Sequence, residues 1–144
     1  MITMNEQALI SLFQTYIAAF KQYDLAVLQK CYAMPCSLHT PEKIAYLASE
    51  HDFEQEFIDI FTVLQHANTQ EIQITKASYD QSIHGLINVC IDWAFIDDSG
   101  EVFADFCAFY QLVDVKLGYK IVSVVSHELS NSVALKNDLI ITQK

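Results

Sequence analysis

The feature that most constrains this fold is a change of hydrophobic period at residue 71. Beyond it, apolar residues alternate along four runs, near residues 71–83, 86–97, 102–113 and 119–128. The connections are short, and the middle one contains Asp98-Ser99-Gly100. Because strands joined by such short loops pair antiparallel, the four runs predict an antiparallel meander.

Three helices are predicted before the meander. Apolar residues at helical spacing predict helices over residues 4–22 and 49–68, and Asp24 is placed to cap a short helix that continues to about residue 32. Two short runs around Pro41 predict a small hairpin between these helices. Helices gathered on one face of an antiparallel sheet make an α+β domain. One side of the last helix is interpreted as solvent-exposed and carries Glu50, Glu54, Glu56 and Asp59.

Length and charge narrow the class of protein. The 144 residues suit one domain over residues 1–144, with a core at about 5–128 and a C-terminal extension at 129–144. The net charge is −10 and all eight cationic residues are lysines, so we expect no nucleic acid partner and favour a neutral or cationic small molecule, or another protein. No apolar run is long enough to span a membrane, and the start of the chain does not resemble a signal peptide. We therefore expect a cytoplasmic protein with reduced cysteines.

This order of elements, in a chain of this length, resembles the NTF2-like superfamily. Its members include nuclear transport factor 2, ketosteroid isomerase, scytalone dehydratase and SnoaL-type polyketide cyclases. The resemblance covers about residues 5–128 and is carried by the helix pair from Tyr16-Ile17 to Cys31-Tyr32 and by Thr40-Pro41. It implies a cone in which a strongly curved sheet wraps the helices and encloses a pocket at the wide end. Many members form dimers through the outer face of the sheet.

The resemblance also implies roles for three positions. Tyr16 matches the helix-one tyrosine that donates a hydrogen bond to the developing oxyanion in ketosteroid isomerases. The general base of those enzymes is an aspartate before a proline, and Thr40 stands there in this chain. Their second oxyanion donor falls near Phe109. Since two of the three groups differ, we do not expect steroid-type isomerisation.

The loop at Gly100 predicts which side chains share a face of the sheet. If residues 97 and 101 pair, Trp93 faces Asp105 and Ile91 faces Cys107. The bulky face would line the pocket and carries Ile87, Val89, Ile91, Trp93, Phe95, Phe103, Asp105, Cys107, Phe109 and Gln111. The other face would be the outer face of the sheet and carries Asn88, Cys90, Asp92, Ala94, Ala104, Phe106, Ala108 and Tyr110. We expect a homodimer through that outer face, the alternative being that the C-terminal extension covers it.

Asp105 and His127 are the candidate proton-transfer groups. Asp105 is the only charged residue in 102–110, and a carboxylate in an apolar pocket could exchange a proton near neutral pH because burial penalises its charged form. The alternative for Asp105 is a structural role at the end of a strand, where its carboxylate would bond to a backbone amide or a lysine. If the last hairpin pairs residues whose numbers sum to 234, His127 faces Cys107 and lies diagonal to Asp105. Tyr16 would then lie across the pocket from this pair. A register shift of one residue would move His127 to the other face of the sheet. The predicted ligand-binding residues are His39, Thr40, Trp93, Cys107 and Phe109.

Two functions follow. The first is a small-molecule-binding protein or cofactor-independent enzyme, which would isomerise, dehydrate or cyclise an apolar uncharged substrate by proton transfer in the pocket. The alternative is a non-catalytic dimeric protein-interaction module whose pocket is filled by its own side chains. A pocket of several hundred cubic ångströms would favour the first. No metal-ligand spacing, phosphate loop or dinucleotide motif occurs, so neither a metal nor a cofactor is predicted.

Overall fold

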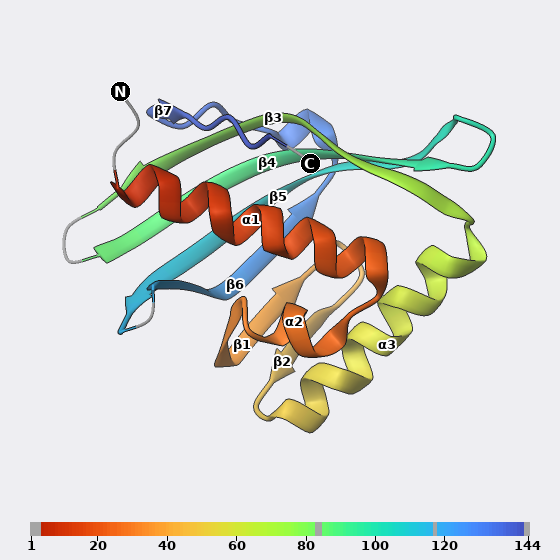
Figure 1. Ribbon diagram of the computed structural model, residues 1–144, viewed down its shortest axis with the longest axis horizontal. Coiled ribbons are helices and arrows are strands. Elements are labelled where there is room, and N and C mark those ends of the chain that lie inside the picture. The colour runs from red at the N-terminus through yellow and green to blue at the C-terminus, as the bar shows by residue number, and fades with distance from the viewer. Residues whose placement is uncertain (1–3, 83–84, 117, 143–144) are drawn as a thin grey trace.

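The computed structural model describes residues 4–82, 85–116 and 118–142 (Figure 1). Helix α1 spans Met4–Gln22 and α3 spans Glu50–His66, close to their predicted bounds, and α2 spans Leu25–Gln29. Side-chain oxygens cap two helices, because Asp24 accepts a hydrogen bond from the Val27 amide and Ser49 accepts one from the Asp52 amide. These local signals are strong enough to fix where both helices begin.

Helix α2 is shorter than predicted. The chain enters strand β1 (Tyr32–His39) at Tyr32, and Pro35 lies inside this strand rather than at the end of a helix. The reason is long-range pairing, because the Ile121 amide donates a 2.9 Å hydrogen bond to the Cys31 carbonyl and Tyr32 pairs with Ile121. Strand β1 pairs antiparallel with β2 (Ile44–Leu47), which forms the predicted small hairpin.

The predicted meander forms as β3 (Thr69–Gln81), β4 (Leu86–Asp97), β5 (Val102–Val115) and β6 (Gly118–His127). Among the described residues, these strands belong to a seven-stranded sheet of order β2-β1-β6-β5-β4-β3-β7, in which β7 is Asn137–Asp138. Neighbours pair antiparallel except β1 and β6, which run parallel. The curved sheet, with α1 lying along it and α3 beside the β1–β2 hairpin, confirms the predicted α+β class (Figure 1).

The turn between β4 and β5 forms as predicted. The Asp97 amide donates to the Glu101 carbonyl at 2.9 Å, and Gly100 adopts a left-handed φ of 83°. One step further along, however, the register shifts between Phe95 and Ile96, where β5 holds an extra residue. This β-bulge separates the register of the turn from the register of the rest of the hairpin.

The bulge makes the predicted pairing of Trp93 with Asp105 wrong. Trp93 pairs with Phe106, and Asp105 pairs with Ala94. Since successive side chains on a strand point to opposite faces, a shift of one residue exchanges the two faces of β5. The residues of β5 on the inner face are Ala104, Phe106, Ala108 and Tyr110. Those on the outer face are Asp105, Cys107, Phe109 and Gln111.

The C-terminal extension crosses part of this outer face. After a short 3-10 helix at Leu129–Asn131, the Ser132 hydroxyl donates a 2.6 Å hydrogen bond to Asp92 of β4. The Leu135 amide then donates to the Ser78 hydroxyl of β3 at 2.9 Å, and β7 pairs with the outer edge of β3. The extension therefore covers the β3 and β4 side of the face, and the homodimer through this face stays a prediction.

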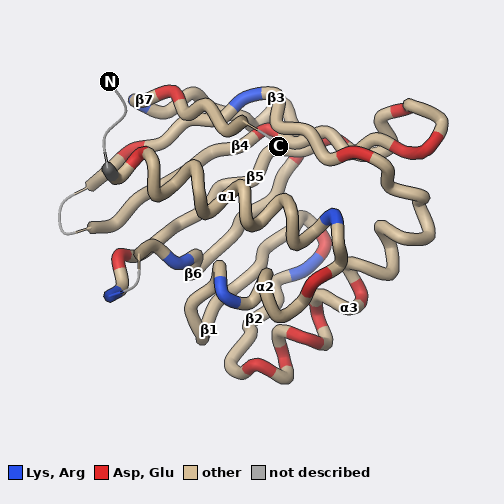
Figure 2. Tube along the Cα trace, in the orientation of Figure 1, with Lys and Arg blue, Asp and Glu red and all other residues tan. Residues whose placement is uncertain are grey.

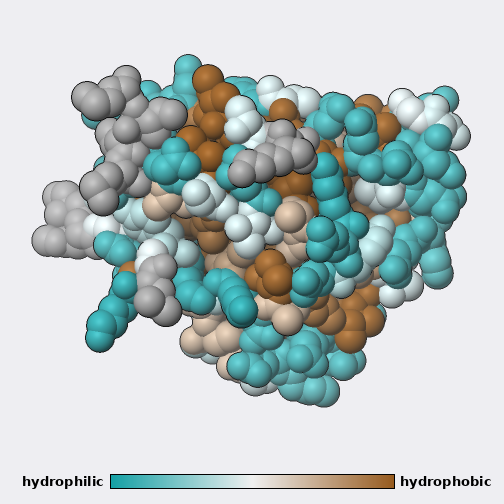
Figure 3. Space-filling model, in the orientation of Figure 1, coloured by the Kyte–Doolittle hydropathy of each residue, from teal (hydrophilic) through white to brown (hydrophobic). Residues whose placement is uncertain are grey.

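The core lies between the helices and the concave face of the sheet, where Leu9, Phe13, Phe53 and Ile91 are fully buried. Acidic residues gather along α3 and at the β4–β5 loop (Figure 2), and hydrophilic residues cover both places in the view of Figure 3. Within the described residues, no helix is both long and apolar enough to cross a membrane. Most acidic residues of these two places therefore lie on the periphery, while the interior around α1 is apolar.

Candidate functional site: an aromatic pocket under the helices

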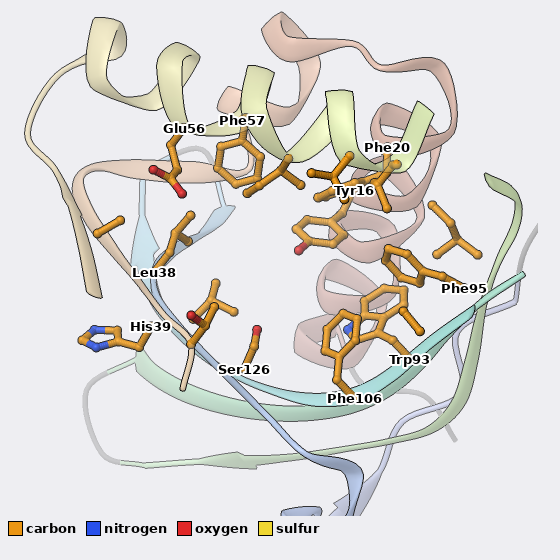
Figure 4. A pocket seen from close by; sticks show the side chains of 18 of the residues that line it. Tyr16, Phe20, Leu38, His39, Glu56, Phe57, Trp93, Phe95, Phe106 and Ser126 are labelled. Atoms are coloured by element: carbon orange, nitrogen blue, oxygen red, sulfur yellow. The ribbon is translucent and has the colours of Figure 1, made fainter. Parts of the chain in front are cut away.

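A cavity of about 450 Å³ opens between the helices and the concave face of the sheet (Figure 4). Side chains from α1, α3, β1, β4, β5 and β6 line it, and most are apolar or aromatic. The aromatic rings that surround it include Phe20, Phe57, Trp93, Phe95 and Phe106. A cavity of this size and lining is typical of a small-molecule site.

A directed chain of hydrogen bonds ends at Tyr16. The Trp93 indole donates to the Tyr110 hydroxyl at 3.0 Å, and that hydroxyl donates to the Tyr16 hydroxyl at 3.2 Å. An indole N–H can only donate, so Tyr110 is the acceptor in the first bond, and its single proton goes to Tyr16 in the second. The Tyr32 hydroxyl also hydrogen-bonds to Tyr16. Both bonds lower the pKa of Tyr16, so its oxygen is the acceptor in each. Its hydroxyl faces the cavity in Figure 4, which leaves its proton for an acceptor on a bound molecule.

The Tyr16 hydroxyl stays protonated at neutral pH. Burial raises its pKa to about 12, and its hydrogen bonds with Tyr110 and Tyr32 act in the opposite direction. Its side chain is only 8% exposed. Tyr16 thus presents a neutral donor in an apolar environment, which suits a carbonyl or another acceptor oxygen.

The cavity brings together four of the predicted site residues. Tyr16 and Trp93 line its inner part, and His39 and Thr40 line it at the β1–β2 turn. His39 Nε2 lies 3.0 Å from the Ser37 hydroxyl, and its ring is directed away from the cavity (Figure 4). The catalytic and binding roles predicted for these residues stay predictions.

The other predicted site residues lie on the outer face. Asp105 is exposed there, and Phe109 lines a separate groove that it shares with Val125. His127 pairs with Cys107 as predicted, but on this outer face, where its Nδ1 accepts from the Glu128 amide at 2.9 Å. The predicted register of the last hairpin holds from Cys107 to Gln111 and shifts by one residue between Gln111 and Leu112. The bulge in β5 changed the face on which His127 lies. Asp105 and His127 do not share a cavity with Tyr16.

The polar side chains of the cavity that were absent from the predicted site are Tyr32, Lys43, Glu56, Tyr110 and Ser126. Glu56 of α3 was interpreted as solvent-exposed, yet it lines the cavity and pairs with Lys43 at 3.0 Å. Helical spacing could have identified it, since it stands three residues after the buried Phe53. Ser126 of β6 also lines the cavity, with its hydroxyl directed inward (Figure 4). The face on which Ser126 lies depends on the register between β6 and β5, in which Ser126 pairs with Ala108.

The described residues contain no group of three histidine, cysteine, aspartate or glutamate side chains arranged to hold a metal ion. The four cysteines are buried and unbridged.

The architecture and the cavity agree with the family comparison. Residues 6–129 match the family described as NTF2-like protein (DUF6841). The chain belongs to this NTF2-like family. No curated protein matches the sequence.

Solved structures show the same NTF2-like fold at low sequence identity. An NTF2-like protein with a cystatin-like fold from Novosphingobium aromaticivorans is 10% identical with a TM-score of 0.73, over 90% of this chain and 84% of that one. An NTF2-like protein of unknown function from Shewanella oneidensis is 10% identical with a TM-score of 0.68, over 85% and 98%. A ketosteroid isomerase-like protein from Erwinia carotovora atroseptica is 12% identical with a TM-score of 0.64, over 88% and 98%. At such identities the likeness establishes the fold and leaves the chemistry to the residues of the cavity.

Proposed function

We propose that this NTF2-like protein binds an apolar, uncharged small molecule in the aromatic cavity and holds an acceptor oxygen of that molecule at Tyr16. The observation that carries the proposal is the open volume of about 450 Å³ beside a buried hydroxyl with an available proton. The alternative function, a protein-interaction module with a filled cone, is disfavoured by the same volume.

The reaction class that fits this arrangement is proton transfer next to the held oxygen, as in an isomerisation, dehydration or cyclisation. Tyr16 would stabilise negative charge that develops on the oxygen, because a preorganised donor in a dry site is effective there. Asp105 lies outside the cavity, so the proton acceptor would come from the residues that line it. Among the described residues of this lining, the acidic side chain is Glu56.

Binding can be tested directly with Trp93, the only tryptophan of the chain, as the fluorescent reporter. The probes are naphthalene and methyl naphthyl ketone, which differ by one acceptor oxygen. We expect the ketone to bind more tightly than naphthalene, and the variant Tyr16→Phe to weaken the ketone alone, by roughly fivefold to tenfold.

Naphthalene is the internal control in this experiment, because Tyr16→Phe keeps the aromatic surface and removes only the hydroxyl. Equal loss of both probes would indicate a disturbed cavity rather than a lost hydrogen bond, and would contradict the assigned role of Tyr16. A protein that binds neither probe would overturn the proposed function.

A further inference from the structure

Glu56 differs from the other acidic residues of α3. Glu50, Glu54 and Asp59 are exposed, whereas the Glu56 side chain is only 19% exposed and lines the cavity. In Figure 4 its carboxylate reaches from α3 into the space above Leu38. A carboxylate in an otherwise apolar lining needs partners to offset the loss of hydration.

Lys43 donates a hydrogen bond to only one of the two oxygens of the Glu56 carboxylate. The Lys43 ammonium donates to Glu56 Oε1 at 3.0 Å, from a side chain that is 56% exposed. Glu56 Oε2 accepts no hydrogen bond from another described residue. The pair therefore fixes the position of Glu56 Oε1 and leaves Oε2 available at the cavity.

The two polar ends of the cavity are complementary in kind. Tyr16 offers a donor and is matched by an acceptor oxygen, whereas Glu56 offers an acceptor and is matched by a donor. Lys43 beside Glu56 disfavours a cationic donor, because like charges repel. A neutral hydroxyl or N–H group is the donor that fits both conditions.

We infer that Glu56 is a specificity-determining residue and that the ligand is an apolar ring compound with two polar groups, a carbonyl-type acceptor toward Tyr16 and a neutral hydrogen-bond donor toward Glu56. This inference rests on the proposed function and adds a second point of recognition to it. Aromatic side chains between the two ends would contact the ring body of the ligand.

The test adds a third probe, methyl naphthyl ketone with a hydroxyl on the distal ring, used at slightly acidic pH so that its phenol is neutral. The wild-type protein should bind this hydroxyketone about tenfold more tightly than the plain ketone, since a hydrogen bond to a charged acceptor is stronger than a neutral one. The variant Glu56→Met keeps the length of the side chain and removes both oxygens, so it should abolish the preference for the hydroxyl.

Glu54→Met is the matched control, because it makes the same change at an exposed position of the same helix. It should keep the tenfold preference. Circular dichroism and melting temperature of both variants separate a local effect from unfolding.

The outcomes distinguish this inference from the proposed function. If the plain ketone binds in a Tyr16-dependent way but the hydroxyl adds nothing, or the preference survives Glu56→Met, the role of Glu56 is wrong and the proposed function stands. If the plain ketone binds no better than naphthalene, the proposed function itself fails at Tyr16.

Discussion

At the scale of single residues, the hydroxyl of Tyr110 links the Trp93 indole to the Tyr16 hydroxyl at the cavity. The Tyr110 hydroxyl accepts a hydrogen bond from the Trp93 indole, which can only donate. It donates its own proton to the Tyr16 hydroxyl, which lines the cavity. Burial raises the pKa of Tyr110 well above its ordinary value, which keeps this relay protonated. Without it, Tyr16 would keep only its hydrogen bond with Tyr32.

Removal of this hydroxyl should therefore cost stability as well as binding. In Tyr110→Phe the Trp93 indole, 2% exposed, loses its acceptor, and a buried unsatisfied donor costs about 1–3 kcal/mol. We expect the free energy of unfolding, measured with urea, to fall by about that amount. Tyr119→Phe makes the same change at a half-buried position and should have little effect. Equal stability of the two variants would contradict the relay.

Residue patterns predicted part of this site. Tyr16 and Trp93 could be identified because helical spacing and the β4 alternation do not depend on the pairing between strands. Asp105 could not be placed, because its face depends on a bulge for which the sequence around Gly100 gives no signal. Ser126 depends on the same register.

At the scale of elements, local signals fixed the helices and tertiary contacts fixed the rest. The capping residues Asp24 and Ser49 marked helix starts, and the Gly100 turn was predicted from its residue types. The end of α2 and the path of the C-terminal extension depend on partners far along the chain, such as Ile121 for Cys31. Local propensity does not report such long-range contacts, so the path of the extension could not be predicted from the sequence.

The attachment of the extension can be tested at Ser132. Its hydroxyl donates to Asp92, whose side chain is buried on the outer face. Ser132→Ala leaves that carboxylate without its partner and should lower the free energy of unfolding by about 1–3 kcal/mol. Ser130→Ala, two residues earlier and exposed, is the control and should be neutral. If limited proteolysis cleaves the extension equally fast in both variants, the Ser132 contact does not hold it.

At the scale of the whole molecule, the same buried hydroxyls and thiols predict sensitivity to alkaline pH. In the folded chain the pKa of Tyr16 is about 12 against an ordinary 10.0, and the pKa values of Cys31 and Cys36 are about 11 against 9.0, in each case because burial penalises the charged form. Raised values mean that the unfolded chain loses these protons first. Their contribution to stability is complete below about pH 9 and is lost as the pH rises through 11 and 12.

We therefore expect the free energy of unfolding to decline above about pH 9, by roughly 1.4 kcal/mol per pH unit for each group in its window. The net charge of −10 grows more negative over the same range, and its repulsion acts in the same direction, so the measurement belongs in high salt, where that repulsion is screened. Urea unfolding at a series of alkaline pH values gives the slope, and Cys31→Ala should reduce it between about pH 9 and 11. A slope that is unchanged in Cys31→Ala would mean that the Cys31 thiol does not contribute to alkaline unfolding in that range.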